Sequence, residues 1–178
     1  MEFKSEAERQ ALDLGVKPEQ VREVAYSIKY VGFEPTRKAL QLGVKPDAVR
    51  YAAFAIRQND VEPTKQALEL KVKPDDLNSV AFSIKKNGFE PTRLAIKELQ
   101  TKPSEVNDIA FSIQHHGFEP TKQALNLSNV IEKFLIMPSD IHHVAFAIKV
   151  YNTKAVRLEL ESGTKPYNLA KVLSKKQP

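Results

Sequence analysis

The apolar residues of this chain follow a helical spacing, and the whole pattern recurs. Val21, Val24, Ala25 and Ile28 have the i, i+3, i+4, i+7 spacing of a helix with one buried face. An alanine holds the third of these positions in every copy, which predicts close approach of neighbouring helices. The same four positions return in four later segments: Val49, Ala52, Ala53, Ile56; Leu77, Val80, Ala81, Ile84; Val106, Ile109, Ala110, Ile113; and Ile141, Val144, Ala145, Ile148.

A proline precedes each of these helical segments. The prolines are 28, 28, 29, 35 and 28 residues apart, at Pro18, Pro46, Pro74, Pro103, Pro138 and Pro166. Proline suits the first position of a helix, so we predict that each first helix begins there. We expect it to end near a residue that tolerates the left-handed conformation. These residues are Gly32, Asp60, Gly88, Gly117 and Asn152.

A second, shorter helix is predicted in each copy. The triplet Glu-Pro-Thr recurs with its glutamate at Glu34, Glu62, Glu90 and Glu119, and we expect the second helix to begin at its proline. In the first copy this helix runs from Thr36 to Leu42. A short linker joins the two helices, and its apolar residue fills the gap between them. That residue is Phe33, Val61, Phe89 or Phe118.

A fixed period of this length is typical of repeat architectures, in which each unit buries its apolar side against its neighbours. We therefore predict an all-α solenoid of tandem two-helix repeats, with a period of about 28 residues, forming one domain over 1–178. We expect an N-terminal half repeat over 1–15, five repeats, and a truncated C-terminal repeat and tail over 164–178. The five repeats are 16–43, 44–71, 72–100, 101–135 and 136–163.

The fourth repeat is seven residues longer than the 28-residue period. Its extra sequence places Val130, Ile131, Phe134 and Leu135 at helical spacing. Seven residues are about two helical turns. Either the second helix of this repeat is extended, or a small third helix follows it.

Composition narrows the class of protein. Hydrophobic residues make up 42% of the 178, enough for a core distributed along a stack of repeats. Cysteine is absent, which is compatible with a reducing compartment. We find neither a signal peptide nor an apolar run of membrane-spanning length. We expect a soluble intracellular protein, in nucleus or cytoplasm, without a membrane partner. The net charge of +5 favours acidic partners.

Basic residues recur at fixed positions of the repeat. A regular line of positive charge matches the phosphates of a nucleic acid, so we predict that these residues contact its backbone. The alternative is that they pair with some of the 22 acidic residues and only keep the protein soluble. The second helices carry Arg9, Arg37, Lys65, Arg93, Lys122 and Arg157; the ends of the first helices carry Lys29, Arg57, Lys85 and Lys149, with Gln114 in the fourth copy.

One pair of residues changes from repeat to repeat, although the residues around it hardly change. One interpretation is an exposed helix end under weak constraint. The other is that each pair reads one element of a polymeric ligand. The pairs are Tyr30-Val31, Gln58-Asn59, Lys86-Asn87, His115-His116 and Val150-Tyr151.

The repeat resembles that of transcription activator-like (TAL) effectors. Pro18-Glu19-Gln20-Val21 is similar to the opening of that family's first helix, and Lys65-Gln66 and Lys122-Gln123 resemble the start of its second helix. The resemblance implies repeats wound into a right-handed superhelix around duplex DNA. It implies that Lys65, Gln66, Lys122 and Gln123 contact phosphate, with Arg37 and Arg93 equivalent by position. It further implies that the variable pairs read bases.

Other chemistry finds little support in the sequence. His115-His116 and His142-His143 lack the cysteine or carboxylate partners that a metal site needs, so we predict no metal site. We find no glycine-rich phosphate loop, nucleophile elbow or metal-helix motif. We expect no cofactor, no small-molecule substrate and no enzymatic activity.

The predicted function is non-enzymatic binding through an extended surface. Our first hypothesis is binding of nucleic acid, duplex DNA above all, through the basic columns and the variable pairs. The alternative is a scaffold that binds a peptide or another protein on the solenoid surface. Two features favour the scaffold: the apolar pairs Tyr30-Val31 and Val150-Tyr151, and an aromatic that recurs beside the alanine, at Tyr26, Phe54, Phe82, Phe111 and Phe146. The basic columns favour nucleic acid.

Overall fold

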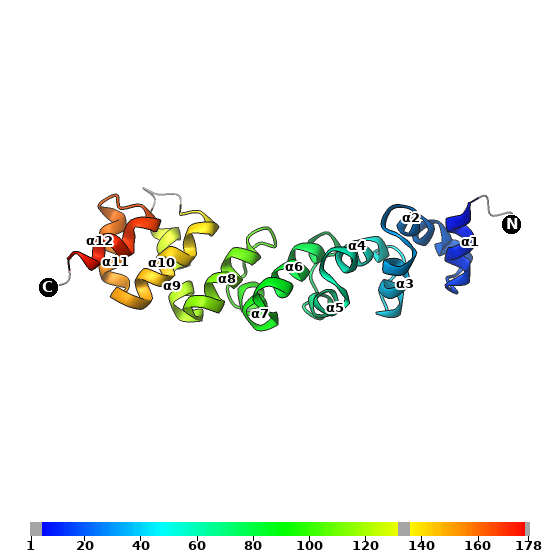
Figure 1. Cartoon of the computed structure of the whole chain (residues 1–178), viewed down its shortest axis with the longest axis horizontal. Helices are drawn as coiled ribbons and strands as arrows, with labels where there is room; N and C mark the ends of the chain where they lie inside the picture. The colour runs from blue at the N-terminus through cyan, green and yellow to red at the C-terminus, as the bar shows by residue number, and fades with distance from the viewer. Residues whose placement is uncertain (1–4, 132–135, 177–178) are drawn as a thin grey trace. The chain divides into compact units, whose positions relative to one another are not determined.

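The chain is all-α, as predicted. A computed structural model describes residues 5–131 and 136–176, and within these ranges it contains helices and no strand (Figure 1). The α-helices are α1 (Glu6–Asp13), α2 (Val21–Val31), α3 (Phe33–Gln41), α4 (Val49–Asn59), α5 (Val61–Glu69), α6 (Leu77–Asn87), α7 (Phe89–Lys97), α8 (Val106–His116), α9 (Phe118–Val130), α10 (Ile141–Tyr151), α11 (Thr153–Glu161) and α12 (Leu169–Ser174).

The helices gather into two compact units, Met1–Lys85 (unit 1) and Lys86–Pro178 (unit 2). In unit 1, α1 packs on α2, and α4 packs on both α2 and α3. In unit 2, α8 packs on α7, α9 and α10, and α10 also packs on α9, α11 and α12. Within each unit, then, the first helix of a repeat contacts the first helix of the next repeat, and the second helices flank them.

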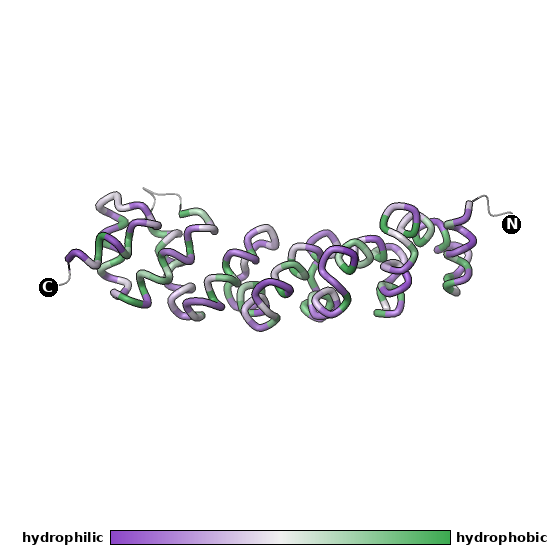
Figure 2. The backbone as a smooth tube through the Cα atoms, viewed as in Figure 1, coloured by the Kyte–Doolittle hydropathy of each residue, from purple (hydrophilic) through white to green (hydrophobic). Residues whose placement is uncertain are grey.

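The predicted core is confirmed. All the apolar positions that define the first helices are buried, from Val21 in α2 to Ile148 in α10. Hydrophobic and hydrophilic residues alternate along the turns of the helices (Figure 2). The second helices of the first four repeats each add one fully buried alanine, at Ala39, Ala67, Ala95 and Ala124. A methyl group at these positions allows the backbones of adjacent helices to approach closely.

The helix starts differ from our prediction. Pro18 opens a short 3-10 turn, η1 (Pro18–Gln20), and α2 begins three residues later at Val21. The Gln20 N–H donates to the Lys17 carbonyl at 2.8 Å, which is the tighter hydrogen bonding of a 3-10 turn. The same turn opens later repeats as η2 (Pro74–Asp76), η3 (Pro138–Asp140) and η4 (Pro166–Asn168).

The predicted ends of the first helices are confirmed, but their conformation is not left-handed helical. At Gly32 φ is 118° and ψ is 158°, and at Asp60 φ is 77° and ψ is 172°. This combination of positive φ and extended ψ is populated almost only by glycine, because a Cβ atom strains it. Asp60 and Asn152 adopt it nevertheless, where other repeats have glycine.

This one residue is the entire connection between the two helices of a repeat. The helix α3 begins at Phe33, directly after Gly32, so the predicted linker is absent and Pro35 is the third residue of the helix. Proline is tolerated there because the first N–H groups of a helix have no intrahelical acceptor. The fourth repeat has the longest second helix, α9, with 13 residues against nine in α3, which confirms the extension. Phe134 and Leu135 lie outside the described residues.

A buried chain of hydrogen bonds fixes the connection. The Thr36 hydroxyl donates to the Gly32 carbonyl at 2.7 Å and lies 2.8 Å from the Ser27 hydroxyl. Each hydroxyl has one proton, so Ser27 must be the donor to Thr36. Both side chains are fully buried. The same chain recurs in the fourth repeat, where Ser112 meets Thr121 at 2.9 Å.

The two partners of this hydrogen bond are lost together in one repeat. The fifth repeat has Ala147 and Val156 at the serine and threonine positions, and both are fully buried. The second repeat has Ala55, and its Thr64 still donates to the Asp60 carbonyl at 2.8 Å. The threonine therefore anchors the connection, and the serine is present only where a threonine can accept from it.

The fifth repeat also replaces the buried alanine of the second helix with Glu159. Its carboxylate is almost fully buried, accepts a hydrogen bond from Thr164 at 3.2 Å and pairs with Lys176. The hydrogen bond from Lys176 lowers the pKa of Glu159, so the carboxylate is charged at neutral pH. The segment after α12 is thereby fastened to α11.

We predict that Thr36→Val destabilises unit 1 by about 2 kcal/mol, because it leaves the Ser27 hydroxyl and the Gly32 carbonyl without their partner. Ser27→Ala alone removes one hydrogen bond and costs about 1 kcal/mol. The double variant Ser27→Ala/Thr36→Val gives the first repeat the apolar pair that the fifth repeat has. Its loss of stability should be about 1 kcal/mol smaller than the sum of the two single losses. Chemical denaturation of the four proteins measures this cycle. Strictly additive losses would contradict a direct coupling between the two hydroxyls.

Candidate nucleic-acid interface

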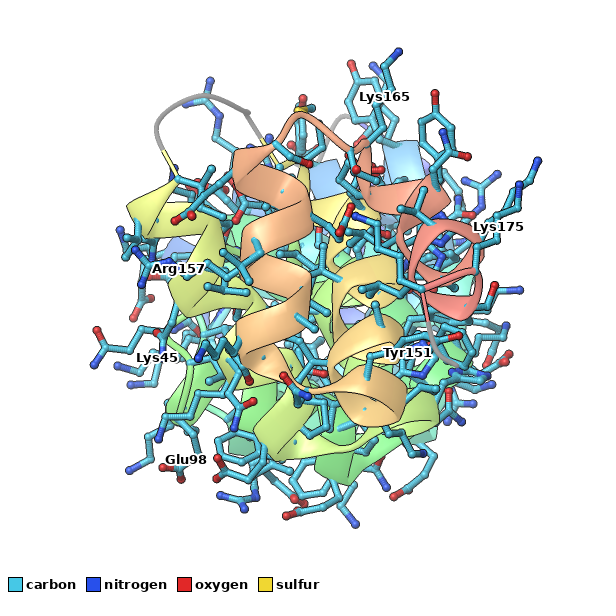
Figure 3. The ribbon with its side chains drawn as sticks, turned by 90° about the vertical axis from the view of Figure 1, so that its left-hand side faces the viewer. Lys45, Glu98, Tyr151, Arg157, Lys165 and Lys175 are labelled. Atoms are coloured by element: carbon cyan, nitrogen blue, oxygen red, sulfur yellow. The ribbon has the colours of Figure 1, made fainter. Side chains whose placement is uncertain are left out.

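The arginines of the second helices form ion pairs. Arg37 pairs with Glu34 at 2.6 Å and Arg93 with Glu90 at 2.7 Å, each three residues earlier on the same helix. These hydrogen bonds lower the pKa of both glutamates. The end members of the column behave alike: Arg9 pairs with Glu6 at 2.8 Å and Arg157 with Glu161 at 2.7 Å. Figure 3 shows Arg157 on the side of α11 turned away from α10.

The lysines of this column, and the glutamines that directly follow them, differ in their surroundings. Lys65 is exposed, and Lys122 lies 5.9 Å from the centre of the Phe118 ring. Gln66 donates to Glu62 at 3.1 Å. Gln123 accepts from the Thr153 hydroxyl at 2.5 Å, so its side chain links two repeats. Two of these four predicted phosphate contacts are therefore held by neighbouring protein groups.

A second set of cations lies on the exposed face of the first helices. We call Lys29, Arg57 and Lys85 of unit 1 the basic row, and Lys149 is its counterpart in unit 2. Arg57 donates to the Val31 carbonyl at 3.4 Å, and Lys85 pairs with Asp60 at 2.9 Å. Arg57 and Lys85 thus reach the carboxyl end of the preceding first helix, where the helix dipole is negative. Lys29 instead lies 5.3 Å from the centre of the Tyr30 ring. The contacts of Arg57 and Lys85 help to hold successive repeats together, and the side chains of the basic row are also exposed to solvent.

The first member of each variable pair is exposed. Tyr30 is 59% exposed and Val150 is 50% exposed. Gln58, Lys86 and His115 are also on the surface. They follow the basic row by one residue and share the outer face of the first helices. These positions are accessible to a ligand, as base reading requires.

The second member of each pair instead contacts the next repeat. Asn59 is 2% exposed and Asn87 is 4% exposed. Asn59 donates to the carbonyl and to the side-chain oxygen of Asn78, at 3.3 and 2.9 Å. Asn87 makes the same two contacts with Asn107, both at 3.1 Å.

The same junction recurs in unit 2 with other side chains. The Tyr151 hydroxyl donates to the Ala170 carbonyl at 3.3 Å, and the His116 ring stacks on His142 at 6.4 Å. Figure 3 shows Tyr151 at the end of α10. Asn78, Asn107, His142 and Ala170 all lie four residues after the opening proline of their repeat. The second member of each variable pair therefore belongs to the junction between two repeats, and Val31 occupies the equivalent position in the first repeat.

An aromatic side chain lies on the exposed face of every first helix. We call Tyr26, Phe54 and Phe82 of unit 1 the aromatic row; they are 47%, 43% and 41% exposed, with Phe111 and Phe146 the counterparts in unit 2. Our sequence analysis counted this recurring aromatic as support for a protein partner, but it did not locate the ring on the exposed side of the helix. The signal was present, because each ring follows the buried alanine by one residue, which is about 100° around the helix.

Four histidines gather on α8 and α10. The rings of His142 and His143 are 3.8 Å apart, and His116 contacts both His142 and Phe146. Burial lowers the pKa of His116 and His143, and the charge of His142 adds to the effect. Among the described residues, no group of three or more His, Asp or Glu side chains is arranged to hold a metal ion.

Comparison with protein-family models, curated proteins and solved structures found no match for the chain. The resemblance to the TAL repeat therefore stays a prediction. Within residues 5–131 and 136–176, no helix has both the length and the apolar character to cross a bilayer.

We predict that Asn59→Ala destabilises unit 1 by about 1–3 kcal/mol, because it removes a buried amide that bonds two groups of the next repeat. Gln58→Ala, one residue earlier but exposed, should change the free energy of unfolding by less than about 0.5 kcal/mol. Chemical denaturation monitored by circular dichroism compares the two. Equal losses in both variants would show that Asn59 does not hold the junction.

We predict that unit 2 loses stability as the pH falls below about 6.5, the ordinary pKa of histidine. The folded pKa of His116 and His143 is lowered, so the unfolded chain binds more protons and protonation favours unfolding. The groups that face them are His142, His115, Lys149 and Asp140.

Melting temperatures between pH 7.5 and 5.0 measure this loss. The double variant His116→Gln/His143→Gln should flatten the dependence in that window. Glu159 titrates at lower pH because its pKa is also lowered, so it does not obscure the result. An unchanged slope in the double variant would exclude these two histidines as its cause.

Proposed function

We propose that the chain is a non-enzymatic, nucleic-acid-binding solenoid of two-helix repeats. The observation that carries the proposal is the basic row, one exposed cation at the same place in each successive first helix of unit 1. Affinity for nucleic acids comes largely from such contacts to phosphate, whose negative charges are also regularly spaced.

The first helices provide a better interface than the second helices. All four arginines of the second helices are paired with a glutamate on the same helix, and a phosphate would have to displace it. In the basic row, among the described residues, only Lys85 has a carboxylate partner, Asp60. The first-helix face combines the basic row with the exposed first members of the variable pairs. We therefore assign backbone contact to the basic row and ligand reading to Tyr30, Gln58, Lys86, His115 and Val150.

The resemblance to the TAL repeat supports a right-handed superhelical arrangement of the repeats, with the first helices along one side. A solenoid of this length is more extended than a globular domain. Small-angle X-ray scattering should then give a radius of gyration clearly above the roughly 16 Å expected for a compact chain of this size. A value near that figure would contradict a solenoid.

We predict that Lys29→Gln/Arg57→Gln/Lys85→Gln weakens nucleic-acid binding and reduces its salt dependence. Loss of three phosphate contacts lowers the slope of log affinity against log salt by about 2 to 3. Fluorescence anisotropy with labelled single-stranded and duplex oligonucleotides, titrated across salt concentrations, measures both quantities.

The matched control removes three cations from the second helices of unit 1, as Arg9→Gln/Arg37→Gln/Lys65→Gln. It changes the net charge equally, and it should retain most of the affinity and the salt slope. Equal losses in the two triple variants would contradict the assignment to the first-helix face. Absence of binding at low salt would overturn the proposal itself.

A protein or peptide partner is the second candidate function. The observation that favours it is the apolar character of two exposed first members, Tyr30 and Val150, each four residues after an exposed ring of its own helix, Tyr26 or Phe146. Helical repeat proteins commonly bind partners along an extended surface. Failure to bind any nucleic acid at low salt, with the fold intact, would favour this candidate.

A further inference from the structure

We infer that the ligand of unit 1 is a single-stranded nucleic acid whose bases stack on the aromatic row, Tyr26, Phe54 and Phe82. The inference rests on the proposed function and specifies its ligand. It comes from the order of side chains along the exposed face of the first helices.

Each ring is close to half exposed, although aromatic side chains are among the largest apolar groups that a fold can bury. The rings occupy the same place in α2, α4 and α6. Neighbouring helices are held in register by the contacts Asn59–Asn78 and Lys85–Asp60. Stacking on such rings is the main sequence-tolerant attraction for unpaired bases.

The basic row follows the aromatic row by three residues, one helical turn closer to the carboxyl end of each helix. Every repeat of unit 1 thus presents one flat ring and one cation. A nucleotide has one flat base and one anionic phosphate. The match between the two sets is the reason to choose a nucleic acid over a peptide, which lacks a regular anion.

The charges on the other side of the rings favour one strand over two. The amino-terminal parts of the first helices and the turns before them carry as many carboxylates as cations, so they have no net positive charge. A second phosphate backbone would gain no net attraction there, whereas a single strand places its only backbone over the basic row. The carboxylates are Glu19, Glu23, Asp47, Asp75 and Asp76, and the cations are Lys17, Arg22, Lys45, Arg50 and Lys73.

A shallow groove of about 250 Å³ lies between the first and second repeats. Tyr26 lines it together with Arg22 and Arg50, and with the carboxylates Glu23 and Asp47. The Arg50 guanidinium is 5.6 Å from the centre of the Tyr26 ring. The same guanidinium donates to the Tyr51 hydroxyl at 2.8 Å. A base stacked on Tyr26 would have its polar edge close to the arginines of this groove.

Fluorescence anisotropy of the full chain with a labelled oligo(dT), an oligo(rU) and a mixed-sequence single strand, each against a duplex of equal length, tests the inference. We expect tighter binding of single strands than of the duplex. Tyr26→Leu, Phe54→Leu and Phe82→Leu keep most of the packing and remove the flat face. Each should weaken single-strand binding about fivefold or more, and the three together about a hundredfold.

Tyr167→Leu is the matched control, because Tyr167 is 56% exposed but belongs to η4 of unit 2 and is not a member of the aromatic row. It should leave single-strand affinity unchanged, and circular dichroism confirms the fold of every variant. Duplex binding as tight as single-strand binding, or full affinity in the triple leucine variant, would overturn the inference and leave the proposed function standing. Absence of all nucleic-acid binding at low salt would overturn both.

Discussion

The structure depends on the threonine that closes the turn between the two helices in four of the five repeats. A single residue with positive φ reverses the chain, and its carbonyl is held by the hydroxyl of Thr36 or its equivalents. At Ser27 and Ser112 a serine of the first helix donates to that hydroxyl, so the bond also joins the helices. Because the connection has no other residue, this bond fixes the angle at which the second helix leaves the first, and with it the packing of the alanines on both.

That constraint determines which side chains face solvent. With the apolar stripe of each first helix buried, the ring of Tyr26 and the cation Lys29 are left on the opposite side, and the same holds at Phe54 and Arg57. The surface chemistry is therefore repeated with the period of the core. A ligand that repeats along its own length is the natural counterpart of such a surface, which is why a polymer is a better candidate than a compact small molecule.

Much of this fold could be predicted from the local sequence. The features that could not be predicted were missed for physical reasons. The core positions and the helix ends follow from apolar spacing and from glycine, and the pairing of Arg37 with Glu34 follows from a separation of three residues. The 3-10 turn at Pro18 was missed because proline fixes only its own φ and leaves the next residues free. The burial of Asn59 was missed because its partner, Asn78, belongs to another repeat. Local periodicity carries no information about such a contact.

The junction contacts described above bear on how the chain can evolve. Asn59 meets Asn78, and Asn87 meets Asn107, so two successive junctions use the same pair of side chains. Loss of the 28 residues 60–87 through unequal recombination would bring Asn59 opposite Asn107 and recreate the native contact. The junctions built on His116 and Tyr151 have no such equivalent. Gain and loss of repeats should therefore be tolerated in the middle of the array and selected against toward its carboxyl end.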